Sequence, residues 1–301
     1  MAKALITSGG GAKGAFTVGA LLALKERGKL PFDVISGTST GSFIAALAAV
    51  DDLETLRQQY LSVEPNDILA KQNIIENVLN GKAFLFDTHP LLKLIDHHIT
   101  QSVFDRIMLP GAPTLCFTAV SLQTGIATIF SNRDLMPPAN HAYKVRKIAN
   151  RKELVDALMA SGSQAGFTPA VEINGEQFVD GGHRDVIPSQ IVVDLGIEEV
   201  YVVSNNPAQQ FTTQKKYNDL LSVILRVISI FVQDVRETDV KILEDFLASK
   251  GKKPIRIEPA SDLDEENPTG LRFNPMAMAA WMNLGKKRVE AILGPVPLNP
   301  V

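Results

Sequence analysis

The sequence predicts an α/β fold in which helices cover a mostly parallel sheet. Expected strands alternate with expected helices along the chain, and this alternation is typical of layered α/β proteins. The segment Glu199–Val203 is almost entirely apolar, as expected for a strand buried on both faces of a parallel sheet. With 301 residues, of which 45% are hydrophobic and 21% charged, the chain has the composition of an ordinary globular protein.

The first fifty residues predict two consecutive strand–loop–helix units. Apolar side chains at helical spacing after a glycine-rich loop indicate the first helix, and Gly28 is placed to end it. The second helix consists largely of small apolar residues, which suits close packing. The expected strands are residues 4–7 and 32–36, and the expected helices are residues 15–27 and 40–50.

The remaining chain continues the alternation and shows no strong linker. Asn174-Gly175 between two short strands is a strong hairpin signal. Further strands are expected at 115–120, 126–130, 170–173, 177–180, 199–203 and 255–257, and helices at 53–60, 66–79, 90–99, 153–161, 215–247 (which one break could divide) and 275–293. We therefore expect a single domain over 1–301, with a motif-bearing core at about 4–205 and a helical C-terminal part at about 215–294.

Composition excludes several classes of function. The formal net charge is −3 and the isoelectric point is about 6.0, so no basic footprint for nucleic acid is present. From the residues at the N-terminus we expect no Sec signal peptide, and the apolar run Leu220–Val232 is expected to be too short for a comfortable transmembrane helix. We expect a cytoplasmic protein or one peripheral at a membrane. The lone Cys116 lies in an apolar run and is expected to be buried in a strand.

The pattern Gly37-Thr38-Ser39-Thr40-Gly41 is the sharpest chemical signal. It is a G-x-S-x-G motif between a predicted strand and a predicted helix, which is the context that a nucleophile elbow requires. Its glycines permit a cramped turn, and the serine then projects beyond the edge of the sheet. We interpret Ser39 as a nucleophile.

The loop Gly9-Gly10-Gly11-Ala12-Lys13-Gly14 joins the first strand to the first helix. Consecutive glycines at a helix N-terminus leave backbone N–H groups free to stabilise an anion, as an acyl-transfer enzyme requires. Gly9, Gly11 and Gly14 also match the dinucleotide fingerprint, with Asp33 as a following acid. That acid, however, starts its strand instead of ending it. Lys13 is interpreted as a residue that fixes the loop, with a solvated lysine as the alternative.

An acid is the expected base for Ser39. No histidine follows His183, so the order of an α/β-hydrolase triad fits poorly, and His97-His98 are expected on a solvated helix face. Asp180 follows a predicted strand and precedes two glycines that permit a sharp turn. We expect partial burial to raise the pKa of Asp180, as proton transfer from a serine would require.

Together, the glycine loop, the serine elbow and the turn Asp180-Gly181-Gly182 resemble the patatin-like phospholipase family over about residues 4–205, and a bacterial member is expected. The resemblance implies a three-layer α/β/α sandwich and a histidine-free Ser–Asp dyad acting on fatty acyl esters of phospholipids and related lipids. It assigns Ser39 as nucleophile and Asp180 as base. It places the oxyanion hole at the N–H groups of Gly10, Gly11 and Ala12. The supporting residues are then Gly9, Lys13, Gly14, Gly37, Gly41, Gly181 and Gly182.

The resemblance implies a serine esterase of the phospholipase A or lysophospholipase type in lipid degradation, without metal or cofactor, in transient contact with a membrane surface. Some positions depart from the family pattern: Ser8 replaces an aspartate, Ala165 a proline and Val186 an asparagine, and His183 adjoins the proposed base. A catalytically silent lipid-binding protein is therefore one alternative, and a dinucleotide-binding protein another. The runs 220–232 and 276–282 are expected to pack in the core, with a lipid groove, lid or membrane contact as the alternative.

Overall fold

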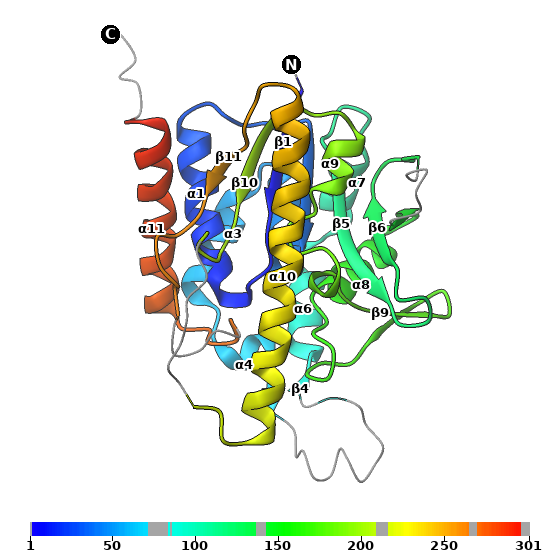
Figure 1. The fold of residues 1–301 in the computed structure, drawn as a ribbon. Coiled ribbons are helices and arrows are strands. Elements are labelled where there is room, and N and C mark those ends of the chain that lie inside the picture. The colour runs from blue at the N-terminus through cyan, green and yellow to red at the C-terminus, as the bar shows by residue number, and fades with distance from the viewer. Residues whose placement is uncertain are drawn as a thin grey trace.

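The computed structural model describes residues 2–71, 84, 86–136, 143–208, 216–264 and 270–295. Within these ranges a nine-stranded sheet carries helices on both faces (Figure 1). Its main path runs β11 (Ile255–Ile257), β10 (Glu199–Val203), β1 (Lys3–Thr7), β2 (Val34–Thr38), β5 (Thr114–Ser121), β6 (Ala127–Ser131) and β7 (Tyr143–Lys147). All neighbours on this path are parallel except β5 and β6. The predicted layered, mostly parallel fold is confirmed.

A hairpin completes the main sheet, and a second, two-stranded sheet lies apart from it. β8 (Val171–Ile173) pairs with β9 (Glu176–Asp180), which also pairs with β5. Both turn residues, Asn174 and Gly175, have positive φ, so the predicted hairpin is confirmed. A separate two-stranded sheet joins β3 (Ala70–Lys71) to β4 (Phe86–Asp87).

Five of the described α-helices begin where a polar side chain accepts an N–H of the first turn. Asp52, Thr100, Asn150, Asp219 and Asn274 each do so at the start of a helix. None of the described helices combines the length and apolarity of a membrane span. The helices are α1 (Gly14–Glu26), α2 (Thr40–Ala48), α3 (Leu53–Ser62), α4 (Pro65–Ile68), α6 (His89–His98), α7 (Gln101–Met108), α8 (Arg151–Ser161), α9 (Gln190–Asp194), α10 (Leu220–Ser249) and α11 (Pro275–Leu293), with single 3₁₀ turns η1 (Gly11–Lys13) and η2 (Gly181–His183).

Two expected helices differ from the observed ones. The helix expected at 66–79 ends at Ile68, after which β3 begins, and residues 72–79 lie outside the described ranges. The helix expected at 215–247 is a single unbroken helix from Leu220, because the carboxylate of Asp219 accepts the Ser222 N–H and sets the start. Periodicity alone located neither boundary.

The strands divide their side chains between two cores. In β1, Leu5 faces a core formed with α1, α2, α8 and α11, whereas Ala4 and Ile6 face a second core with α9 and α10. Cys116 is fully buried in β5, as predicted. In α11, Met278, Trp281 and Met282 are buried in the first core, which confirms core packing for that part of the run 276–282.

Helices α1 and α11 pack against each other through glycine. A Cβ on Gly19 would lie 1.8 Å from the Met282 carbonyl oxygen, and a Cβ on Gly285 would lie 2.0 Å from that of Phe16. The backbones therefore approach more closely than any side chain would allow. Figure 1 shows α11 running alongside α1 at one edge of the molecule.

Replacing Gly19 with alanine is expected to destabilise the fold by about 2 kcal/mol, because the new methyl group forces the two helices apart. Without this contact, alanine within a helix would be favoured by about 1 kcal/mol, so the sign of the change in unfolding free energy tests the contact. Urea unfolding measures the effect. Gly111→Ala is the control, since a Cβ there meets nothing within 4 Å. Equal stability of Gly19→Ala and wild type would contradict the packing.

Candidate active site

Ser39 lies on a strained turn between β2 and α2. Its φ of 56° and ψ of −131° are unusual for a residue with a side chain and cost on the order of 1–3 kcal/mol. Hydrogen bonds hold it in place: its N–H donates to Ser161 Oγ at 2.9 Å, and its carbonyl oxygen accepts from the N–H and hydroxyl of Ser42. The side chain is only partly buried and lines a cavity. This is the geometry of a nucleophile elbow.

The glycine loop lies directly against this elbow. The pairing of Thr7 with Gly37 in β1 and β2 brings the two strand ends together. A Cβ on Gly9 would lie 2.7 Å from Ser39 Cβ, so only glycine fits there. The elbow itself is equally tight, because a Cβ on Gly37 would lie 2.4 Å from the Gly41 carbonyl oxygen. Gly14, at the start of α1, packs against Tyr60.

The proposed oxyanion donors differ in their backbone bonds. The Ala12 N–H donates to the Gly270 carbonyl oxygen at 2.8 Å and is therefore already used within the protein. Gly10 and Gly11, with φ of 140° and 55°, line the cavity beside Ser39. Among the described residues neither N–H has a hydrogen-bond acceptor. We accordingly retain Gly10 and Gly11, and not Ala12, as the proposed donors.

Two polar contacts from distant segments fix the loop. Lys13 is only 2% exposed, and its ammonium lies 2.6 Å from Asp262 Oδ1. The alternative of a solvated lysine is therefore wrong, and Lys13 fixes the loop as interpreted. Asn205, just after β10, donates its amide to the carbonyl oxygens of Ser8 and Gly9 and accepts from Thr17 Oγ1 at 2.8 Å.

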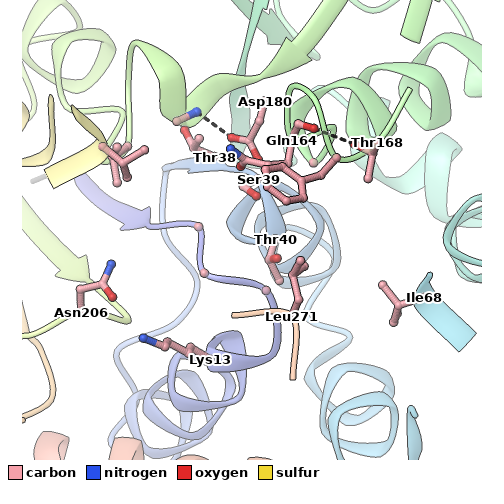
Figure 2. Close-up of a pocket in the computed structure, with 18 of the residues that line it drawn as sticks. Lys13, Thr38, Ser39, Thr40, Ile68, Gln164, Thr168, Asp180, Asn206 and Leu271 are labelled. Atoms are coloured by element: carbon pink, nitrogen blue, oxygen red, sulfur yellow. Dashed lines mark hydrogen bonds between the residues drawn. The ribbon is translucent and has the colours of Figure 1, made fainter. Parts of the chain in front are cut away.

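Asp180 ends β9 and is buried beside Ser39 (Figure 2). Its Oδ1 accepts the Gly182 N–H at 2.7 Å, and its carboxyl group lies beside the side chain of Ser39. Burial raises the pKa of Asp180, while the neighbouring Ser39 side chain, the Gly182 N–H and nearby His183 oppose the rise. Gly181 must be glycine, since a Cβ would lie 2.3 Å from the Thr118 carbonyl oxygen. The side chain of Asp180 is thus buried, as predicted.

Two further buried carboxyl groups, those of Asp185 and Asp239, support the segment after Asp180. Asp239 on α10 accepts the N–H groups of Val186 and Ile187 at 2.8 and 2.9 Å. Asp185 accepts the Thr118 hydroxyl at 2.8 Å. Burial raises the pKa of both carboxyls, and the charge of Asp185 raises that of Asp239 further. Asp239 thereby supports the turn at the position where the resemblance expects the asparagine that Val186 replaces.

The cavity beside Ser39 has a volume of about 510 Å³. Ser39, Asp180 and the glycine loop lie at one part of its wall, and aliphatic and aromatic side chains form much of the remainder. The apolar lining comprises Phe43, Tyr60, Val63, Ile68, Leu69, Leu91, Leu94, Ile95, Leu158, Phe167, Val186, Ile228, Val232, Leu271 and Phe273. Its shape and lining suit a ligand with a long apolar portion.

The dinucleotide alternative is not supported by the positions of its residues. Asp33 lies just before β2, where its carboxylate accepts the Lys3 N–H at 2.8 Å. That is the amino end of the strand, opposite the glycine loop. The carboxyl end of β2 carries Ser39 instead. In the described ranges no three His, Cys, Asp or Glu side chains are grouped as metal ligands.

Four supporting residues were missed by the sequence analysis: Ser161, Asn205, Asp239 and Asp262. Each contacts a motif residue or the adjacent turn from a segment far along the chain. A signal existed only for Ser161, because Ala160-Ser161 through Pro169 loosely matches the family's Ala-Ser-x-x-x-Pro segment, in which Ala165 replaces the proline. No local pattern marked the others. His97 and His98 lie on α6 and do not line the cavity, whereas His183 does.

The profile of the patatin-like phospholipase family matches residues 5–212. The chain therefore belongs to the patatin-like phospholipase family.

Curated relatives share this region. The chain is 25% identical to lysophospholipase NTE1 of Candida albicans, covering 94% of this chain and 20% of that protein. It is 27% identical to patatin-like phospholipase domain-containing protein 7 of Rattus norvegicus, covering 73% of this chain and 14% of that protein. The chain thus spans a fifth or less of these relatives. VipD from Legionella pneumophila has the same fold, with a TM-score of 0.51, 13% identity, and coverage of 97% of this chain and 66% of VipD.

Asp239→Asn is expected to flatten the pH dependence of stability. Because the folded-state pKa of Asp239 is raised above 3.8, the folded protein binds the proton more tightly than the unfolded chain, and stability falls as pH rises through the folded-state value. Asparagine keeps an oxygen for the two N–H groups but cannot ionise. Unfolding free energies from urea titrations at about pH 5, 7 and 9 measure this.

The matched control is Asp234→Asn, an exposed position on the same helix, which should leave the slope unchanged. Parallel pH curves for wild type and Asp239→Asn would show that Asp239 does not carry the raised pKa.

Proposed function

We propose that this protein is a serine acyl hydrolase of the lysophospholipase type, with Ser39 as nucleophile and Asp180 as base. The observation that carries the proposal is the position of the buried Asp180 beside Ser39 on the wall of a largely apolar cavity. The names of the curated relatives support a lipid ester as substrate. Membership of the family supports the same chemistry.

In the acylation step, Asp180 accepts the Ser39 hydroxyl proton as Oγ attacks the ester carbonyl. The N–H groups of Gly10 and Gly11 stabilise the oxyanion that forms. As the tetrahedral intermediate collapses, the bond to the leaving alcohol breaks and Asp180 returns the proton to that oxygen. Water then attacks the acyl-enzyme, with Asp180 accepting its proton and passing it to Ser39 Oγ. The products are a fatty acid and the free alcohol.

The environment of Asp180 suits both halves of this cycle. A fully solvated carboxylate is too weak a base to take a serine proton readily, whereas desolvation raises its basicity. The Gly182 N–H fixes one carboxylate oxygen, so the carboxyl group keeps its orientation when the proton moves. The strained backbone of Ser39 presents Oγ to the cavity without adjustment.

The alternative of a catalytically silent lipid-binding protein rested on the residues near Asp185 that differ from the family pattern. Val186 stands where the family has asparagine, but Asp239 accepts the N–H groups of Val186 and Ile187. The turn after the proposed base is thus supported by another residue. The observation therefore favours the enzyme over the silent protein.

Ser39→Ala and Asp180→Asn are each expected to lower kcat/KM on p-nitrophenyl acyl esters by roughly a thousandfold or more, since each removes half of the dyad. Ser102→Ala, an exposed serine on α7, is the control and should retain full activity. Intact-mass analysis after fluorophosphonate treatment should show one adduct that Ser39→Ala lacks. Full activity of either dyad variant would rule out the mechanism.

The rate should also depend on the ionisation of Asp180. Only the carboxylate form of Asp180 can act as base. We therefore expect kcat/KM to fall as the pH drops through the pKa of Asp180, which burial raises above the ordinary value of 3.8. Initial rates between about pH 4 and pH 8, corrected for spontaneous ester hydrolysis, give this profile. A flat profile over that range would exclude Asp180 as the base.

A further inference from the structure

Helix α10 exposes an apolar face to solvent over its first three turns. We call Val223, Ile224, Val227, Ile230 and Phe231 the outer stripe; their exposed fractions run from 41% at Val223 to 65% at Phe231. Their spacing places all five side chains on one side of the helix. In Figure 1 this yellow part of α10 extends beyond the strands toward the lower end of the molecule.

Another side of α10, from Ser222 to Arg236, lines the cavity mainly with polar side chains. We call Ser222, Arg226, Ser229, Gln233 and Arg236 the inner stripe, and all five side chains belong to the cavity wall. Ile228 and Val232 lie among them on the same wall. A surface helix normally turns its apolar face inward and its polar face to water. In the first half of α10, by contrast, the outer stripe turns five apolar side chains to solvent, while polar side chains, together with Ile228 and Val232, face the cavity.

The second half of α10 has the usual arrangement, which identifies the first half as the exception. Leu243 and Leu247 are buried in the second core, and Asp239 binds the turn after Asp180. The helix is thus anchored to the sheet at one end. Its other end carries the outer stripe beside the cavity. The expectation that the run 220–232 packs in the core is wrong for the outer stripe.

We propose that the outer stripe docks on a phospholipid surface and so brings the cavity to its substrate. The choice of a lipid as partner rests on the proposed function. Ser222 precedes Val223, and Arg226 precedes Val227, so a surface that covers the outer stripe lies next to the cavity wall.

The chemistry of these turns fits a lipid interface. The outer stripe contains no charged residue, and its most exposed member is aromatic. Arg226 is the only charged residue from Leu220 to Gln233, and a cation at the edge of an apolar face can contact lipid phosphate groups. An apolar face flanked by a cation is the pattern of helices that lie in the interface of a bilayer.

Flotation with phosphatidylcholine vesicles tests the docking without turnover when all proteins also carry Ser39→Ala. The double variant Ile224→Ser/Phe231→Ser is expected to lower the vesicle-bound fraction at limiting lipid by about tenfold. The control, Leu109→Ser/Leu122→Ser, changes side chains that are 56% and 52% exposed elsewhere, and should bind like the parent. Circular dichroism checks that both variants are folded.

Two outcomes would overturn the proposal: no flotation of the parent protein, or equal flotation of the outer-stripe variant. A third contradicting outcome would come from light scattering. If the parent protein is a dimer and the outer-stripe variant is a monomer, the outer stripe binds a second copy of the chain and not a lipid surface. Hydrolysis of a water-soluble p-nitrophenyl ester with Ser39 intact separates the two proposals. Stripe-dependent flotation without hydrolysis would refute the proposed function alone, whereas hydrolysis without flotation would refute the docking alone.

Discussion

The parallel pairing of β1 with β2 is the interaction on which the site depends. Parallel neighbours end at the same edge of the sheet, so the glycine loop after β1 and the serine elbow after β2 must share one space. That space is small: Gly9 approaches Ser39, and Gly37 approaches Gly41, at distances that exclude a Cβ. The glycines are therefore required by packing at the edge of the sheet as much as by any role in binding an oxyanion.

β5 extends the same constraint to the base. Its first half pairs with β2 and its last residues pair antiparallel with β9, so Asp180 arrives at Ala119, close to the carboxyl end of β2. The Thr118 carbonyl oxygen accepts from Ser161 Oγ, which in turn accepts the Ser39 N–H. One strand thus sets the relative position of the proposed nucleophile and base, through pairing on one side and a hydrogen-bonded serine on the other.

The sequence was informative where function depends on local turn chemistry. The G-x-S-x-G elbow and the Asp-Gly-Gly turn lie at strand ends, as the motifs predict, because glycine patterns report the backbone conformation of the residues that carry them. The hairpin at Asn174 was predictable for the same reason. β7 was not expected, because Tyr143–Lys147 is an edge strand with mostly polar side chains and gives no apolar signal.

The sequence was uninformative where a partner comes from a distant segment. Lys13 is buried only because Asp262 neutralises it, and the Ala12 N–H is used only because Gly270 approaches the loop. Burying an unpaired ammonium would cost several kcal/mol, so the loop and the segment around Asp262 must fold together. Nothing in the local pattern of either segment indicates the other. The sequence therefore could not predict which N–H groups of the glycine loop bind within the protein and which remain available to the cavity.

Helix α10 connects the buried and exposed parts of the site. Its second half lies on the sheet, where Leu243 and Leu247 fill the core and Asp239 holds the two N–H groups that follow the Asp180 turn. Arg236, one turn earlier, is buried against Glu258 at 3.0 Å and lines the cavity. Any tilt of the first half relative to the sheet would strain this buried ion pair and the Asp239 bonds, since removing either partner leaves an unpaired buried charge. The contacts that support the turn after the proposed base therefore also fix the wall of the cavity and the orientation of the apolar face outside it.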